Sequence, residues 1–169
     1  MSISMYQASV PVLIRGLANL SHILDKGALH AVSRKIDPAV FLNARLYPDM
    51  FSLTRQVQSA SDAAKAAGAR LAGIEVPGMA DTESSFLELQ QRIDKTVHFL
   101  RGLKPAQIDG SEARPVSFKT RTRELNFTGQ DYLLQFALPN FFFHVGAAYA
   151  ILRHNGVELG KLDYLGTFD

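Results

Sequence analysis

The stretch Phe136–Gly156, FALPNFFFHVGAAYAILRHNG, decides how the rest of this 169-residue chain can fold. It lies in a longer segment, from Asp131 to Arg153, whose interior contains no Asp, Glu, Lys or Arg. Asn140 and His144 are polar side chains in this apolar run, and their i, i+4 spacing puts both on one face of a helix. A buried helix can carry such groups only where each finds a hydrogen bond, a ligand or a metal. The stretch therefore predicts a central helix beside a polar pocket.

The composition predicts one globular domain, residues 1–169, with a full apolar core. Apolar residues make up 47% of the chain and charged residues 20%, the usual proportions of a folded protein. The sequence has no cysteine, which excludes disulfides, thiolate metal sites and a cysteine nucleophile, and which fits a reducing cytoplasm. A formal net charge of +2 is too small to indicate the basic face of a nucleic-acid-binding protein.

The apolar segments do not predict a membrane protein. The N-terminal stretch MSISMYQASVPVLIRG has no basic segment ahead of its apolar part, which argues against a signal peptide. Residues 132–152 are long enough to raise a membrane span, which needs roughly 20 apolar residues. However, Gln135, Pro139, Asn140 and His144 interrupt this run. We therefore expect a bundle helix, no membrane partner and a cytoplasmic location.

Three further segments carry apolar residues in steps of three and four, which is the pattern of helices packed in a bundle. We expect these helices over about 4–26, 48–72 and 82–102. Ser4 opens a capping box ahead of the first helix, and Gly27 is expected to end that helix. Pro48 suits the first turn of the second helix, and Asp81 or Thr82 is expected to cap the third.

Residues 106–128 include apolar and polar side chains in alternation, which predicts a short β-hairpin. Thr128 is expected to cap the next helical segment, and Pro139 to kink or restart the last helix, which runs to Asn155. The tail after Gly156 is expected to pack back on the other helices. The fold class is therefore all-α, an antiparallel four-helix bundle with a small β-hairpin between helices three and four.

Several phrases of the sequence resemble a known superfamily, the DinB/YfiT-like four-helix bundles. The phrases LYPDM, RQVQ, ARLAG and FALPNFFFHVGAAYAILRHNGVELGK are similar to an uncharacterised, domain-of-unknown-function branch of it, and the resemblance covers nearly the whole chain. In the wider superfamily, three histidines bind a divalent metal, one on helix two and two in an H-x-x-x-H pair on helix four. Relatives include thiol-cofactor transferases and isomerases whose metal activates the thiol, and they are commonly homodimers.

The metal-binding pattern of that superfamily is incomplete in this sequence. The pair on helix four is Asn140-x-x-x-His144, and helix two has no histidine, with Gln56 or Gln58 near the expected position. One His, one Asn and one Gln make a poor site, because zinc prefers His, Cys and carboxylates. We therefore expect a degenerate metal site with His144 as its one ligand candidate, although a carboxylate from Asp49 or Asp62 would improve it.

Two further sets of side chains have both a structural and a functional interpretation. Asp49, beside Tyr47, is either a helix-start carboxylate or a polar group that faces the same end of the bundle as the pocket. Lys119, Arg121 and Arg123 fall on one side of the expected hairpin. They form either a solvated strand face or a contact for an anion.

Three functional hypotheses stay open at this point, and the sequence does not decide whether the protein is an enzyme. In the first, a core pocket built by His144, Asn140 and Gln56, with Asp49 and Tyr47 nearby, binds a small molecule, and His144 is a hydrogen-bond partner or a base. In the second, the protein resembles its metal-dependent relatives and is a transferase or hydrolase with His144 as a ligand. In the third, it is a non-catalytic homodimer whose polar groups only fix the packing.

Overall fold

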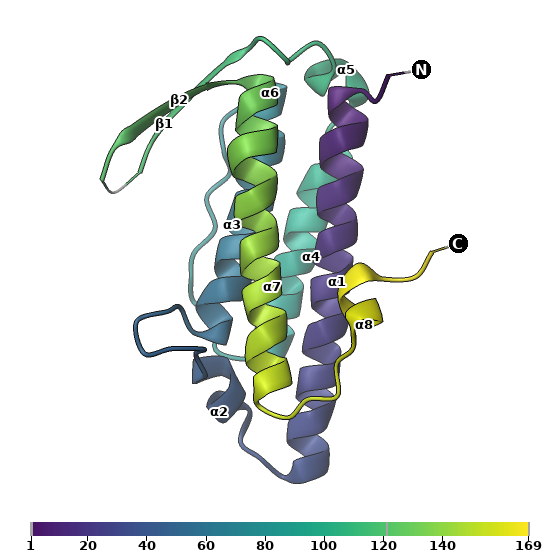
Figure 1. Ribbon diagram of the computed structural model, residues 1–169, viewed down its shortest axis with the longest axis vertical. Coiled ribbons are helices and arrows are strands. Elements are labelled where there is room, and N and C mark those ends of the chain that lie inside the picture. The colour runs from purple at the N-terminus through teal and green to yellow at the C-terminus, as the bar shows by residue number, and fades with distance from the viewer. Residues whose placement is uncertain (1, 121, 169) are drawn as a thin grey trace.

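A computed structural model describes residues 2–120 and 122–168 of the chain, and four long helices dominate it (Figure 1). They are α1 (Met5–Arg34), α3 (Leu53–Ala72), α4 (Phe86–Gly102) and α7 (Leu138–His154). Each turns an apolar stripe toward a shared core, in which the leucines of α1 meet the alanines of α3 and the aromatic residues of α7. The predicted four-helix bundle is therefore confirmed.

The helices α4 and α7 both run opposite to the direction that a simple up-down-up-down bundle would give them, because α4 is parallel to α3 and α7 is parallel to α1. Gly68, near the end of α3, has no room for a Cβ, which would stand 2.7 Å from the side chains of Leu100 and Leu103 at the end of α4. Because the C-terminal ends of both helices meet, α3 and α4 are parallel neighbours. The connection 73–85 must then cross the length of the bundle, as Figure 1 shows. A chain of this length reaches about 40 Å when extended, which exceeds the roughly 25 Å length of α4.

The start of α1 is predicted correctly, but its end is not. The Ser4 hydroxyl caps the Gln7 amide, and the Gln7 side chain returns to the Ser4 amide in the expected capping box. The helix continues through Gly27 to Arg34 and ends at Lys35, which has a φ of 56°. Gly27 is buried because Leu152 and Phe86 pack closely against it. The glycine permits close helix packing there and does not end the helix.

The starts of α3 and α4 lie later than the sequence predicts. Ser52 caps α3 by accepting from the Arg55 amide, so Pro48 lies ahead of the helix. Ser85 caps α4 by accepting from the Glu88 amide, in place of Asp81 or Thr82. At each of these starts the serine hydroxyl accepts a hydrogen bond from the amide three residues later, which has no partner within the helix. A short helix, α2 (Pro38–Asn43), lies between α1 and α3.

The β-hairpin projects from the end of the bundle where α7 begins (Figure 1). After the short α5 (Pro105–Ile108), strands β1 (Pro115–Lys119) and β2 (Glu124–Thr128) pair antiparallel, with Phe118 opposite Leu125. Thr128 caps α6 (Gly129–Asp131) as predicted. A π-helical segment, η1 (Tyr132–Ala137), leads from α6 into α7, so the chain adjusts one turn ahead of Pro139.

The tail packs back on the bundle as predicted. Helix α8 (Lys161–Leu165) lies along α1, where Asn19 donates to the Tyr164 carbonyl and Lys26 pairs with Asp163. In the part of the chain that the structure describes, no helix combines the length and the apolarity that crossing a membrane requires.

Candidate functional site

His144 of α7 and Gln56 of α3 meet between the two helices. Their side chains are 9% and 1% exposed, and His144 Nδ1 lies 2.8 Å from Gln56 Oε1. The amide group of Gln56 is oriented by a second contact, since its Nε2 donates to the Phe51 carbonyl at 3.4 Å. The amide oxygen must then face the imidazole as an acceptor, so Nδ1 of His144 is the donor. The pair thus fixes the neutral tautomer of His144 that carries its proton on Nδ1.

The second nitrogen of His144 is left with a lone pair. Its Nε2 has no hydrogen-bond partner among the described residues. It is not among their fully buried polar atoms that lack a hydrogen bond, so it is accessible from outside the protein. Burial lowers the pKa of His144, and the positive charge of Arg55 lowers it further. Both effects favour the neutral ring at neutral pH. His144 therefore presents an uncharged acceptor of fixed orientation.

Two aromatic rings hold the imidazole in place. The Phe51 ring stacks nearly parallel to it, with centroids 6.4 Å apart and an interplanar angle of 11°. The Phe143 ring meets it edge-on at 5.3 Å. Together with the Gln56 hydrogen bond, these contacts leave His144 little rotational freedom.

His144 lies at one end of a groove of about 290 Å³ between α3, α7 and the hairpin. The groove is lined by one face of α3, by one face of η1 and α7, and by the end of β1 that leads into the hairpin turn. The lining residues are Arg55, Ser59, Asp62, Ala63, Ala66, Arg70, Phe118, Lys119, Thr120, Tyr132, Phe136, Ala137, Asn140 and His144. Its α3 wall includes the small side chains of Ser59, Ala63 and Ala66, which leave space that larger residues would fill.

The structure brings together three of the five residues that the sequence singled out. His144 and Gln56 are hydrogen-bonded, and Asn140 is half-buried one turn from His144 in the same groove. Tyr47 and Asp49 are exposed in the turn ahead of α3, and neither lines the groove. We therefore leave these two residues out of the candidate site.

The family is decided by comparison with known proteins. The family described as "Domain of unknown function (DUF1993)" matches residues 5–165. The chain belongs to the DUF1993 family. A crystal structure titled as a DinB family member protein from Shewanella denitrificans is 40% identical, covers 96% of this chain and 92% of that chain, and has a TM-score of 0.87. No curated protein matches. The predicted resemblance to an uncharacterised DinB-like branch is confirmed.

The divalent metal site of the wider superfamily does not fit the side chains of this DUF1993 protein. His144 is the one histidine among the described residues that line the groove, and Gln56 directs its oxygen to Nδ1 instead of to a shared centre. Asp62 also lines the groove, but its Oδ1 is held by Lys65 and Arg92. Among residues 2–120 and 122–168, no three His, Cys, Asp or Glu side chains gather where they could hold a metal ion. The positive charge of Arg55 further opposes a cation beside His144.

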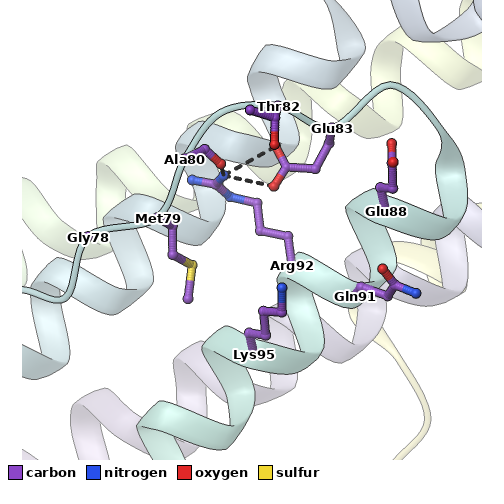
Figure 2. Close-up of a pocket in the computed structure, with 9 residues that line it drawn as sticks. All are labelled: Gly78, Met79, Ala80, Thr82, Glu83, Glu88, Gln91, Arg92 and Lys95. Atoms are coloured by element: carbon purple, nitrogen blue, oxygen red, sulfur yellow. Dashed lines mark hydrogen bonds and ion pairs between the residues drawn. The ribbon is translucent and has the colours of Figure 1, made fainter.

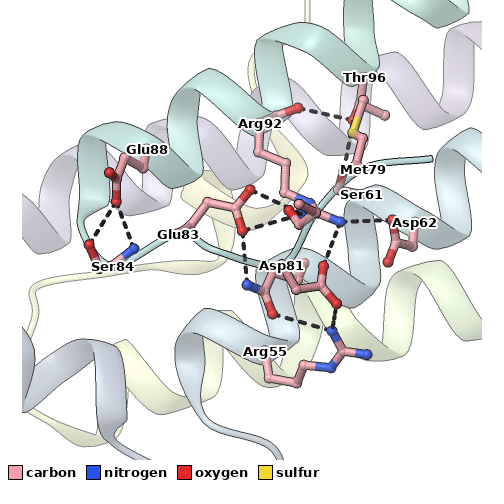
Figure 3. Close-up of polar contacts among 12 residues, drawn as sticks. Arg55, Ser61, Asp62, Met79, Asp81, Glu83, Ser84, Glu88, Arg92 and Thr96 are labelled. Carbon is pink, nitrogen blue, oxygen red and sulfur yellow. Dashed lines mark hydrogen bonds and ion pairs between the residues drawn. The ribbon is translucent and has the colours of Figure 1, made fainter. Parts of the chain in front are cut away.

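A buried ionic cluster surrounds Arg92 of α4, and no pattern in the sequence indicated it. Figure 3 shows this side chain, which is 1% exposed, extending between α3 and the 73–85 connection. Its Nη2 lies 2.8 Å from Asp62 and 3.0 Å from Asp81, and its Nη1 lies 3.0 Å from Glu83. Nη1 also donates to the Ala80 carbonyl. These contacts attach the crossing connection to both parallel helices.

The Arg92 cluster continues to the groove through α3. Asp81 also pairs with Arg55, and Glu83 accepts from Gln58 at 2.9 Å. Burial alone would raise the pKa of Glu83, but the hydrogen bonds from Gln58 and Arg92, with the charge of Arg92, lower it below its usual value. The cluster therefore positions Arg55, which in turn acts on His144.

A larger hollow of about 490 Å³ lies beside this cluster, and Figure 2 shows the side chains around it. Its polar wall is already occupied, because Glu83 is bonded to Arg92, and Glu88 accepts from the Ser84 amide and hydroxyl. We prefer the smaller groove as the candidate site, because it holds an oriented acceptor that no side chain uses.

Proposed function

We propose that this DUF1993 protein binds a small molecule in the groove between α3 and α7, and that His144 Nε2 accepts a hydrogen bond or a proton from it. One observation supports the proposal above the others. The Gln56 oxygen orients the imidazole so that its lone pair faces space instead of a protein donor. An acceptor whose orientation the protein fixes, and which no protein donor uses, is open to a ligand that enters the groove.

The shape and lining of the groove agree with a compact ligand. Its volume of about 290 Å³ is near the lower end of the roughly 300–1,000 Å³ that ligand pockets occupy. Asn140 adds an amide donor and acceptor one turn from His144, while Ala63, Ala66 and Ala137 give apolar contact. A molecule with an acidic N–H or O–H beside a small apolar part matches this pattern.

The protonation state of His144 also suits a proton acceptor. Because its pKa is lowered, the ring is neutral at neutral pH and its lone pair is available. If the ligand reacts, the same nitrogen would act as a general base on the proton that it contacts.

A fragment screen by protein-observed NMR tests this proposal. Small phenols and N–H heterocycles should shift the resonances of His144, Asn140 and Ala137, and these shifts should be lost in His144→Phe, which keeps a ring against Phe51. His98→Phe is the matched control, since His98 is exposed on α4. Fragments that bind equally well to His144→Phe, or hits confined to other surfaces, would contradict the proposal.

We also retain the homodimer as a proposal. The support is the uncharged outer surface of η1 and α7, where Leu134 and Phe143 are 52% and 58% exposed. Contiguous apolar patches on a protein surface often mark protein contacts, and Leu134 and Phe143 are the large apolar side chains exposed on this surface. Analytical ultracentrifugation should then show a dimer that Phe143→Glu dissociates, and a wild-type monomer at high concentration would contradict it.

A further inference from the structure

The groove has a second end, far from His144, where Arg70 of α3 meets the hairpin. Fourteen residues of helix separate Gln56 from Arg70, which corresponds to roughly 21 Å along the axis. Phe118 of β1 and Tyr132 of η1 both contact this arginine. The hairpin end is therefore a separate place in the fold, and its chemistry does not depend on the role of His144.

Arg70 is held in a fixed orientation by aromatic groups instead of by a carboxylate. Its guanidinium lies 3.9 Å from the centroid of the Phe118 ring, and its Nη1 donates to the Tyr132 hydroxyl at 3.0 Å. Stacking on a ring leaves the edge of the planar guanidinium available for hydrogen bonds. Of its five N–H donors, the Tyr132 contact uses one.

No carboxylate pairs with Arg70 in the described part of the chain. Among the described residues, no ion pair includes Arg70 or its neighbour Lys119. The other arginines on this side of the bundle differ, because Arg55 pairs with Asp81 and Arg92 with three carboxylates. Arg70 is also only half-exposed. A partly desolvated guanidinium with unused donors binds an oxyanion more strongly than a fully solvated one.

Two other groups of the hairpin line the same end of the groove. Lys119 adds a second positive charge, and Thr120 adds a hydroxyl. Phe118 and Phe136 give apolar walls, with ring centroids 5.1 Å apart. Arg121, which the sequence grouped with Lys119, lies outside the described residues.

We propose that the hairpin end of the groove is an oxyanion site, in which Arg70 binds the carboxylate or phosphate of an organic anion with Lys119 in support. The aromatic walls favour an anion that carries a ring or another flat apolar group. A single ligand that also reached His144 would have to be extended, whereas a smaller anion would occupy this end alone.

Three aromatic probes of similar size test the site by NMR titration of the full chain. Benzoate and phenyl phosphate carry the two possible anions, and benzamide is the neutral counterpart of benzoate. At least one anion should bind with saturation and shift the Arg70 Nε–H and Phe118 resonances, and benzamide should not. The tighter of the two anions identifies the group that the site prefers. If neither anion shows saturable binding, the proposal is wrong.

Variants separate the oxyanion site from a general charge effect. Arg70→Gln should weaken binding of the preferred anion at least tenfold, and Lys119→Gln should weaken it severalfold. Arg101→Gln, which changes an exposed arginine of α4, should leave the dissociation constant unchanged. An unchanged constant in Arg70→Gln with an intact hairpin would overturn the proposal. If Arg70→Gln loses the hairpin, the test rests on the Arg70 Nε–H resonance of the wild type. If that resonance does not move with either anion, the oxyanion site is likewise ruled out.

Discussion

The clusters around Arg92 and around His144 are both buried between helices, yet they differ in what is left unbonded. Both terminal nitrogens of Arg92 are occupied by the Ala80 carbonyl and three carboxylates, and only Nε has no partner in the described part of the chain. His144 has one nitrogen bonded to Gln56 and the other facing a groove. A saturated cluster stabilises one arrangement of the chain, whereas an oriented acceptor without a partner is prepared for a ligand.

The positions of the two clusters explain this difference. Arg92 attaches the 73–85 connection, which crosses the bundle without secondary structure of its own. The connection needs side-chain contacts to stay against the helices. His144 lies where α3 and α7 already pack along each other, so its free nitrogen is not required to hold the fold. Burial of a polar group therefore does not indicate function by itself, and a hydrogen-bond acceptor that no protein group uses is the better sign.

The largest effect is expected from Arg92→Met. Removing the guanidinium leaves Asp62, Asp81 and Glu83 close together without their shared cation, so the free energy of unfolding should fall by about 3 kcal/mol or more. Urea unfolding followed by circular dichroism measures this. Arg101→Met on the exposed side of α4 is the control and should change stability by less than about 0.5 kcal/mol. Equal stability of the two variants would mean that the Arg92 cluster does not hold the connection.

A smaller effect, with a defined pH range, is expected from Glu83→Gln. Because the folded pKa of Glu83 lies below its usual value of 4.5, its stabilising contribution is complete above that value and is lost as the pH falls through the folded pKa. The free energy of unfolding of the wild type should therefore exceed that of the variant by about 1.5 kcal/mol at pH 6. This difference should shrink below about pH 4.5.

Urea titrations at pH 6 and at pH 3 measure the difference between wild type and Glu83→Gln. Glu75→Gln is the matched control, since Glu75 is an exposed acid of the same connection. If the stability of Glu83→Gln follows that of the wild type at both pH values, Glu83 does not act as a charged partner of Arg92.

His144→Phe should cost about 1 kcal/mol at neutral pH, because Gln56 loses its donor while the ring packing is kept. The folded pKa of His144 is lower than its ordinary value of 6.5, so its contribution is present above 6.5 and is lost as the pH falls through the folded pKa. The difference between wild type and variant should narrow from pH 7.5 to pH 5. Thermal unfolding across this range measures it, and a constant difference would show that burial does not oppose protonation of His144.

The smallest effects are expected at the two predicted site residues that lie outside the groove. Tyr47→Phe and Asp49→Asn change exposed side chains, so stability should shift by less than about 0.5 kcal/mol. Binding of fragments that shift His144 should also be unchanged in both variants. A loss of fragment binding in either one would mean that the turn ahead of α3 belongs to the site.

Much of the fold could be predicted because it depends on local patterns. The apolar stripes indicated the four helices, the alternation after Pro105 indicated the hairpin, and Ser4 indicated the first cap. Errors arose where a local signal has two meanings. Gly27 suits a helix end and also a close packing position, and only the Leu152 and Phe86 side chains across the core decide between them.

The candidate site was predicted in part, for a related reason. His144 stood out because it interrupts an apolar run, and Gln56 lies beside the apolar stripe of its helix. Both residues can therefore be recognised from the sequence alone. Arg92 was missed, although it follows Leu89 by three residues and so falls near the buried stripe of α4. Its partners come from α3 and from the crossing connection, whose path no local pattern encodes. Arg70 was missed likewise, because its aromatic contacts lie on the distant hairpin and η1.

The tautomer of His144 is the most direct test of the central claim. Long-range ¹H–¹⁵N correlation spectra at pH 7.5, assigned by comparison with His144→Phe, report which ring nitrogen carries the proton. We predict a neutral ring with the proton on Nδ1 and a bare Nε2, as the Gln56 oxygen requires. A proton on Nε2, or a charged imidazolium at that pH, would contradict the account, because no acceptor would then face the groove.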